Sequence, residues 1–182
     1  MKPPILTTER LLLRPLRETD AAAIQEYFAR WSIIQHLSTD VPWPYPEDGA
    51  EQFIRGQMTK EASSEDLCWA ITERGRDTLI GVIEYISDTQ RGDNRGFWLG
   101  EAWHGRGYMT EAIIAVQDYL FLDLGLDRIL VLNAIDNIRS RRIKEKTGAQ
   151  LLGRVPFEHR NGCNESEQWE ITQRGWRKFR GL

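Results

Sequence analysis

A strand pattern that runs into a glycine-spaced turn and then into a long amphipathic helix is the feature that most limits how this chain can fold. Residues Arg95–Gly100 read as a strand, Gly105 and Gly107 follow, and apolar side chains then recur every three or four residues up to Gly125. The first N–H groups of a helix lack partners within it, and glycine lets a ligand approach the backbone closely. Such a turn can bind phosphate, although two glycines alone also fit an ordinary strand-to-helix turn.

Two common nucleotide-binding motifs do not fit this turn. No Gly-Lys-Ser/Thr follows, which excludes a Walker loop, and the spacing Gly-x-Gly-x-x-Gly is not completed after Gly107. A phosphate site here must therefore be of another kind.

The remaining patterns predict a mixed α/β fold. Strand-like runs cover Arg10–Leu16, Leu67–Thr72, Thr78–Ile86, Arg95–Gly100, Arg128–Asn133, Ala149–Phe157 and Glu167–Thr172. Helical patterns cover a segment capped by Thr19-Asp20 and ending near Arg30, a segment from Pro46 to about Lys60, residues 107–125, and Ile138–Lys146. Three consecutive strands between residues 67 and 100 suggest an antiparallel meander, so the order is neither a Rossmann nor a TIM-barrel alternation.

Length and composition predict one domain over residues 1–182, because the chain has 182 residues and no linker-like tract. The formal net charge of −3 favours neither a nucleic acid nor an anionic membrane as partner. Cys68 and Cys163 lack the spacing of metal ligands, so no metal site is expected. Without a signal peptide or a spanning apolar run, the sequence predicts a soluble, cytoplasmic protein.

The proline- and tryptophan-rich segment Val41–Pro46 cannot form regular structure, since each proline removes a backbone donor and restricts the residue before it. A loop of this kind between two helices can line a cleft. A packed surface loop explains it equally well.

The run Trp-His-Gly-Arg-Gly-Tyr-Met-Thr-Glu-Ala that begins at Trp103 resembles the pyrophosphate loop of the GNAT superfamily of N-acetyltransferases. The family pattern is Gln or Arg, two residues, Gly, one residue, then Gly or Ala. His104 takes the first place, Gly107 the central one and Met109 the last. Two of the three places therefore depart from the pattern, which a loop that binds through its amides tolerates.

A second segment agrees independently, since residues 133–148 resemble the family's Asn-x-x-Ser…Lys-x-Gly-Phe segment. Asn137, Ser140, Lys146 and Gly148 match, while Ala149 replaces the usual aromatic residue. Weaker similarities at the N-terminus, in the Pro-Trp-Pro loop and after Gly153 point to the branch that resembles ribosomal-protein-alanine N-acetyltransferases (RimJ/RimL-like).

This resemblance implies the GNAT acyl-CoA N-acyltransferase fold, with about six to seven strands flanked by four or more helices. It implies that an acetyl group passes from acetyl-CoA (coenzyme A) to a primary amine by direct attack in a ternary complex. The acceptor could be a protein N-terminus or a small molecule such as an antibiotic, a polyamine or an amino acid. A non-catalytic acyl-CoA-binding sensor is the alternative from another class, and the protein could be a monomer or a homodimer.

The resemblance also implies which residues hold the donor. The strand at residues 96–100 would separate from Arg128–Asn133 and admit the pantetheine arm between them. The residues so assigned to coenzyme A are Trp98, Leu99, His104, Gly105, Arg106, Gly107, Tyr108, Met109, Asn137, Ser140, Arg142 and Lys146.

Acetyl transfer needs an unprotonated amine, a stabilised oxyanion and a proton for the departing thiolate. Ser140 is the hydroxyl expected near the sulfur, or else simply a polar residue in the first turn of a helix. Glu84 lies in an apolar strand, where burial would raise its pKa into a range suited to a base, or it faces solvent. Glu158 follows the Gly153 segment and is a second candidate base.

Overall fold

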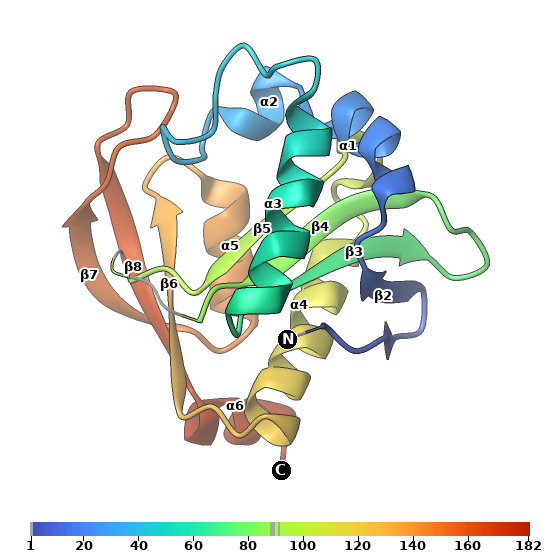
Figure 1. The fold of residues 1–182 in the computed structure, drawn as a ribbon. Helices are drawn as coiled ribbons and strands as arrows, with labels where there is room; N and C mark the ends of the chain where they lie inside the picture. The colour runs from blue at the N-terminus through green and yellow to red at the C-terminus, as the bar shows by residue number, and fades with distance from the viewer. Residues whose placement is uncertain (1, 88–89, 91) are drawn as a thin grey trace.

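Two antiparallel sheets form the centre of the molecule, as seen in the computed structural model, which describes residues 2–87, 90 and 92–182 (Figure 1). Within these residues the larger sheet runs in chain order: β1 Leu6–Thr7, β2 Leu11–Pro15, β3 Leu67–Glu73, β4 Leu79–Tyr85 and β5 Arg95–Leu99. The smaller sheet has the order β6-β8-β7: β6 Arg128–Ala134, β8 Glu165–Thr172 and β7 Gln150–Pro156. The meander expected between residues 67 and 100 is confirmed by the antiparallel pairs β3–β4 and β4–β5.

Helices cover both faces of the larger sheet (Figure 1). On one face lie α1 Ala21–Phe28, α2 Trp31–Ile34 and α3 Gly49–Ser63, and on the other lies α4 Tyr108–Asp118, which continues as a π-helical turn over Tyr119–Asp123. The helix α5 Ile138–Lys146 lies against the smaller sheet, and α6 Gln173–Arg180 ends the chain.

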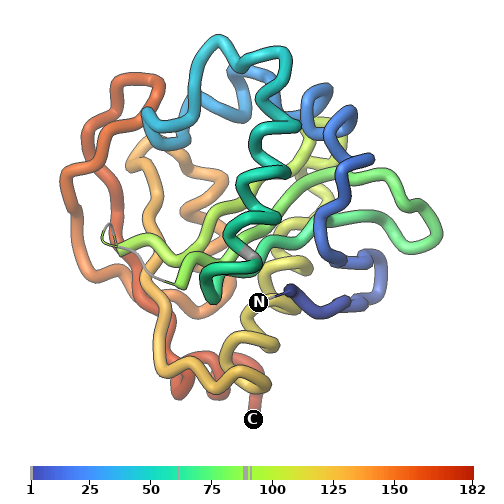
Figure 2. Tube along the Cα trace, in the orientation of Figure 1, coloured from blue at the N-terminus to red at the C-terminus, as the bar shows by residue number. Residues whose placement is uncertain are grey.

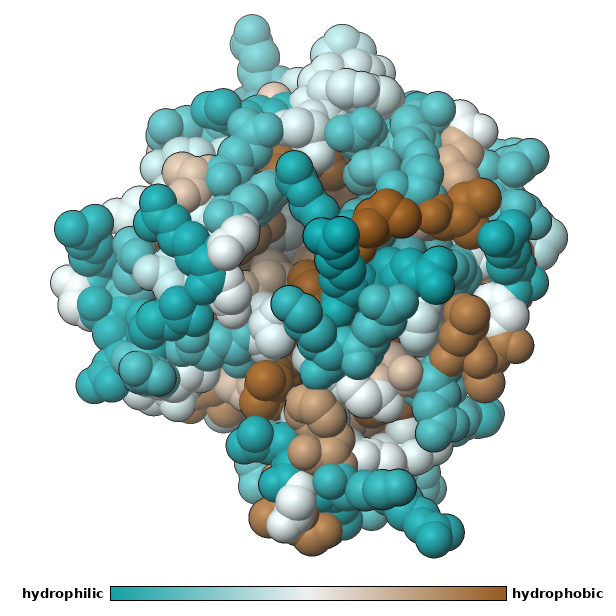
Figure 3. All heavy atoms as spheres, turned by 180° about the vertical axis from the view of Figure 1, so that it is seen from behind, coloured by the Kyte–Doolittle hydropathy of each residue, from teal (hydrophilic) through white to brown (hydrophobic). Residues whose placement is uncertain are grey.

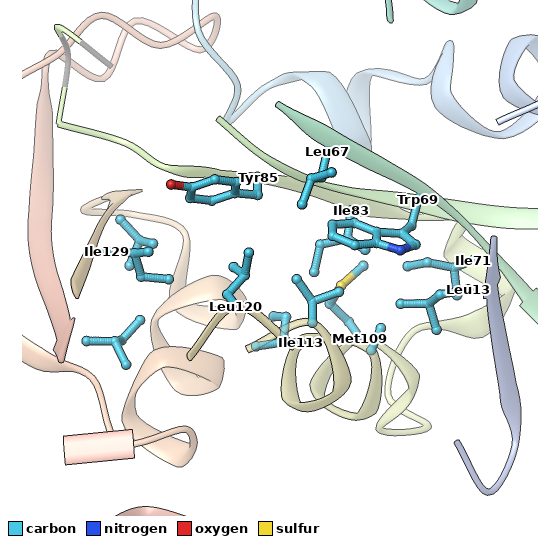
Figure 4. Packing of buried hydrophobic residues seen from close by; sticks show 14 of the residues in the cluster. Leu13, Leu67, Trp69, Ile71, Ile83, Tyr85, Met109, Ile113, Leu120 and Ile129 are labelled. Carbon is cyan, nitrogen blue, oxygen red and sulfur yellow. The ribbon is translucent and has the colours of Figure 1, made fainter. Parts of the chain in front are cut away.

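Period-two alternation along β3 explains how one strand serves two cores. Trp69 and Ile71 pack toward α4, whereas Cys68 and Ala70 face the layer of α1 and α3. The α4-side core is shown in Figure 4, where Trp69 lies beside Met109. Burying an aliphatic or aromatic side chain stabilises a fold by roughly 1.5–3 kcal/mol, so a strand buried on both faces fixes the sheet between its helices.

The two sheets meet at the starts of β5 and β6. The Asn94 N–H donates to the Leu130 carbonyl at 2.7 Å, and the Asn94 side chain accepts from the Leu130 N–H at 2.9 Å. Across the described part of the chain, no backbone hydrogen bond joins β5 itself to β6. Further along β6, the Leu132 N–H donates to Asp93 Oδ1 at 3.1 Å. Among the described residues, Asp93 and Asn94 thus connect the two sheets, and β5 itself does not pair with β6.

The N-terminal segment runs beside α4, as the tube in Figure 2 shows. Arg10 Nε donates to Glu111 at 2.7 Å, and the Arg10 N–H donates to the same carboxylate at 2.9 Å. The first strands of the chain are thus attached to the helix that follows the glycine-rich turn.

All seven predicted strands are present, with ends within two residues of those expected. The sequence patterns missed β1, α2 and α6, and they placed the start of α3 three residues too early. The expected Asp20 cap of α1 is wrong: the Asp20 carboxylate accepts from the buried Arg14 at 2.8 and 2.9 Å and makes no side-chain cap bond to α1. A buried arginine competes for that carboxylate more strongly than a helix N–H.

The face opposite to the view of Figure 1 is mostly hydrophilic, with a few separate hydrophobic patches (Figure 3). Among the residues that the structure describes, no helix is both long and apolar enough to cross a bilayer.

Candidate active site

The glycine-rich turn presents a group of unpaired backbone donors. A 3₁₀ turn over Glu101–Trp103 follows β5, and Gly105 and Gly107 then adopt φ values of 76° and 80°. Gly107 is the N-cap of α4, and side-chain-bearing residues are strained in this left-handed region. Within the described chain, the backbone N–H groups of residues 105–110 donate no hydrogen bond to other protein groups. The turn therefore offers consecutive N–H donors at a helix N-terminus, the arrangement that binds anionic phosphates.

The side chains after Gly107 point away from these donors. Met109 is buried in the core on the sheet side of α4 (Figure 4), and the Tyr108 hydroxyl donates to Glu73 at 2.8 Å. This explains physically why Met can stand where the family pattern has a small residue: its side chain fills the core, and only its amide faces the turn.

Arg10, in the N-terminal segment, contacts the same turn. Its guanidinium donates to the Arg106 carbonyl at 2.9 Å and lies 4.6 Å from the centre of the Tyr108 ring. Its pairing with Glu111 also offsets a carboxylate that would repel an anion bound at the start of α4.

His104 links three elements. Its Nε2 lies 2.7 Å from the Leu99 carbonyl, so this nitrogen carries the proton and donates. Its Nδ1 then accepts from Arg139 at 3.2 Å. The ring therefore joins the turn to the end of β5 and to α5, and one of the two backbone groups of Leu99 is already hydrogen-bonded.

At the start of α5, Asn137 is the N-cap and its side chain accepts from the Ser140 N–H at 3.2 Å. Ser140 is half-buried in the first turn. Arg142 and Lys146 are exposed one turn apart on this helix, and Lys146 lines an open groove of about 760 Å³ together with Gly107. The contact between Arg139 and His104 brings the start of this basic helix beside the turn.

The sequence patterns missed a lysine on the buried side of this helix. Lys144 is 1% exposed, and its Nζ donates to Ser140 Oγ at 2.9 Å and to Asn133 Oδ1 at 3.4 Å. Desolvation, together with the positive charge of Arg95, lowers the pKa of Lys144 to about 7. The available signal was its position four residues after Ser140, on the same side of the helix, but spacing does not reveal burial.

Further charged groups are buried beside Lys144. Arg95 donates to Gln117 at 2.6 Å, and desolvation lowers the pKa of the Arg95 side chain to about 10. Glu167 accepts from Arg141 at 2.8 Å. Among the described residues, Arg95 Nε, Arg95 Nη2 and Glu167 Oε2 are buried without a protein partner. Polar clusters of this kind are costly unless they are satisfied, which favours a functional reason for keeping one here.

Glu84 lies under α3, on the face of the larger sheet opposite to α4. Gln57 donates to its carboxylate at 2.9 Å, and desolvation raises the Glu84 pKa. A Cβ atom added at Gly96 of β5 would lie 2.3 Å from Glu84 Oε1, so the carboxylate rests directly on the β5 backbone. Glu84 as a whole is half-buried, between Gln57 of α3 and the β5 backbone. Trp98 is half-buried on the same face, 5.1 Å from the Phe28 ring.

Glu158 is not brought together with Ser140 or Glu84 by any contact in the described residues. Its side chain is exposed, and its carbonyl accepts from the Thr39 N–H at 3.3 Å. The adjacent His159 is buried and contacts the His36 carbonyl and Ser166, both at 2.9 Å.

The Val41–Pro46 loop packs against the segment after β7, because the Val41 carbonyl accepts from Arg160. Its Trp43 is 40% exposed and lies 5.1 Å from the ring of Trp31, which is 39% exposed. Arg30, next to Trp31, pairs with Glu101 at 3.3 Å. The aromatic pair is thus anchored near the end of β5.

Comparison with known proteins agrees with this geometry. The chain matches the Acetyltransferase (GNAT) domain family over residues 10–150. It is 31% identical over 156 residues to the N-acetyltransferase YoaA of Bacillus subtilis (strain 168), covering 82% of this chain and 85% of that protein. It is 26% identical over 166 residues to the ribosomal protein uS5-alanine N-acetyltransferase of Escherichia coli (strain K12), covering 84% of this chain and 77% of that protein.

Among solved structures, Mycobacterium smegmatis RimJ in complex with CoA-disulfide has a similar fold, with a TM-score of 0.75 at 20% identity over 89% of this chain and 81% of that one. Three findings on the described residues lead to one assignment: β5 and β6 do not pair with each other, the turn has unpaired amides, and the family model matches residues 10–150. The chain belongs to the GNAT family of N-acetyltransferases, for which acetyl-CoA is the typical acetyl donor.

Proposed function

We propose that this N-acetyltransferase acetylates the α-amino group at a protein N-terminus. The observation that carries this proposal is the 26% identity, over 84% of the chain, to an enzyme named for acetylating the alanine of a ribosomal protein. The exposed Trp31–Trp43 pair near the end of β5 supports it, because paired aromatic rings offer a rigid apolar surface to the side chains of a peptide.

The residues of the turn suit the donor substrate. The N–H groups of Gly105, Arg106, Gly107, Tyr108 and Met109 would hold the pyrophosphate. Arg142 and Lys146 on α5 would neutralise further phosphate charge. In the β4–β5 ladder the Gly100 N–H donates to Ile80, so by antiparallel alternation Trp98 turns its backbone groups to β4 and Leu99 turns its own to the open edge of β5. Because His104 already binds the Leu99 carbonyl, the Leu99 N–H would hydrogen-bond a pantetheine amide there.

In the proposed direct attack, one side chain accepts a proton from the amine and another donates a proton to the leaving thiolate. Glu84, whose pKa is raised by burial, would accept a proton from the attacking amine, directly or through water. Ser140 would donate its hydroxyl proton to the departing thiolate sulfur. The acetyl carbon loses its bond to sulfur and gains one to nitrogen, so an amide and a free thiol are the products.

The acceptor is tested by measuring thiol release from acetyl-CoA with matched panels of amines. One panel contains peptides that begin with alanine or serine, together with the same peptides carrying a blocked N-terminus. The other contains polyamines, aminoglycosides and free amino acids. We expect turnover with unblocked peptides and a mass increase of one acetyl group at their α-amine.

Turnover confined to the small-molecule panel would overturn the peptide proposal and leave the family assignment intact. Binding of acetyl-CoA without turnover in either panel would instead indicate a sensor.

A further inference from the structure

The Lys144 ammonium lies at the junction of the two sheets. It comes from α5, contacts Asn133 of β6 and lies 5.9 Å from the centre of the Phe97 ring of β5. It is almost fully buried and touches the hydroxyl that the proposed mechanism uses. Its position is therefore directly behind Ser140, on the side away from solvent.

Hydrogen-bond geometry fixes the direction of the Ser140 proton. An ammonium has three donors and no acceptor, and its neighbours here are Ser140 Oγ, Asn133 Oδ1 and the face of Phe97. When Lys144 donates to Oγ, the Ser140 hydroxyl proton must point elsewhere. Because Ser140 is half-buried and Lys144 occupies its inner side, that proton is directed away from Lys144, toward the exposed side of Ser140.

The charged groups around Lys144 keep both of its protonation states accessible. Arg95 of β5 disfavours the ammonium, whereas the carboxylates of Asp93 before β5 and Glu167 of β8 favour it. Glu167 is in turn bonded to Arg141 on α5. A buried lysine with two cations and two carboxylates nearby can lose and regain a proton without leaving a large uncompensated charge.

We propose that Lys144 is a positioning residue that orients the Ser140 hydroxyl and resupplies its proton when Ser140 protonates the leaving thiolate. This inference rests on the role of Ser140 in the proposed function. In the step, the carbon–sulfur bond breaks as the sulfur takes the Ser140 proton, and Ser140 Oγ takes a proton from Lys144 Nζ. Lys144 becomes a neutral amine and regains its proton from solvent after the products leave.

Proton affinities support this direction of transfer. A thiol has an ordinary pKa of about 8.5, and a serine hydroxyl is a far weaker acid than that. Ser140 alone would therefore be left as a high-energy alkoxide. An ammonium whose pKa lies near 7 is acidic enough to protonate a thiolate through the serine.

The test compares Ser140→Ala, Lys144→Met and the double variant in single-turnover acetyl transfer to the best amine found for the native enzyme. Methionine retains an unbranched side chain of similar length without the ammonium. We expect each single variant to be slower by about tenfold, with the acetyl-CoA KM changed by less than about twofold, and the double variant to be no slower than either single one.

The pH profile supplies a readout that a packing role would not change. In the native enzyme the rate should fall as pH rises through the Lys144 pKa, because only the ammonium can resupply the proton. Ser140→Ala and Lys144→Met should both lack this alkaline limb. Lys178→Met, on the exposed face of α6, is the matched control and should retain the native rate and profile.

Three results separate the possible failures. Native kinetics in Ser140→Ala would remove Ser140 from the proposed mechanism and this inference with it. A slow Ser140→Ala variant beside a native-like Lys144→Met variant would overturn only the role of Lys144. Multiplicative losses in the double variant, or an alkaline limb that persists in Lys144→Met, would show that Lys144 does not act through Ser140.

Discussion

Single residues determine where the candidate acid and base of this site lie. Gly96 leaves room for the Glu84 carboxylate, since any Cβ at this position would collide with it. Asn137 caps α5 and thereby holds Ser140 in the first turn, and Lys144 reaches the same hydroxyl from one turn further on. The Glu84 carboxylate thus lies on the α3 side of β5, whereas Lys144, which contacts Ser140, lies near Phe97 in the core on the α4 side.

At this scale, Glu84→Gln tests the assignment of the base. Because burial raises the pKa of Glu84, the native kcat should fall as pH drops through that raised value and the carboxylate gains a proton. The variant should lose this acid limb and at least about tenfold in kcat, while Glu158→Ala should change kcat by less than about twofold. Glu51→Gln on the exposed side of α3 is the control. An acid limb retained in Glu84→Gln and lost in Glu158→Ala would reverse the assignment.

At the scale of elements, the position of the first turn of α4 depends on the backbone conformation of Gly107 and on the contacts of Arg10. Gly107 supplies the left-handed turn that points consecutive N–H groups outward, while Arg10 and Glu111 attach the turn to the N-terminal segment. The amide donors need no particular side chain, so we expect binding at this turn to depend on the path of its backbone more than on the identity of His104 and Met109.

Gly107→Ala should weaken acetyl-CoA binding by about tenfold, because a side chain at positive φ adds about 1–2 kcal/mol of strain that the turn relieves by moving. Gly125→Ala is the matched control: it has a φ of 73° at the far end of the same helical segment and open space around its Cβ. Both variants should lose similar stability in urea unfolding, and calorimetric titration should find weaker binding in Gly107→Ala alone. Equal losses of affinity would trace the effect to general destabilisation.

For the molecule as a whole, one apolar core connects the two sheets. Ile83 of the larger sheet, Val131 and Trp169 of the smaller one, and Trp176 of α6 belong to the same buried cluster. In the part of the chain that the structure describes, β5 and β6 do not pair, and Asp93 and Asn94 alone bond to β6 at this junction, so side-chain packing and not strand pairing holds the halves together. This arrangement keeps a strand edge unpaired without dividing the hydrophobic core.

We therefore predict that the chain unfolds as a single cooperative domain over residues 1–182. Differential scanning calorimetry should give equal calorimetric and van't Hoff enthalpies, and circular dichroism and tryptophan fluorescence should report the same midpoint in urea. Separate transitions for the two probes would indicate that the smaller sheet unfolds independently.

The sequence by itself determined seven of the eight described strands, the main helices and the family, because hydrophobic period, glycine position and the two motifs are local properties. Ser140 and the amide turn followed from those motifs, and Glu84 from its place in an apolar strand. Only the tertiary structure decided that Glu84 lies under α3, that His104 bonds to Leu99 and Arg139, and that Lys144 is buried beside Ser140. Burial, and with it the pKa of a charged group, depends on which distant elements cover a residue, and a single sequence does not contain that information in any local pattern.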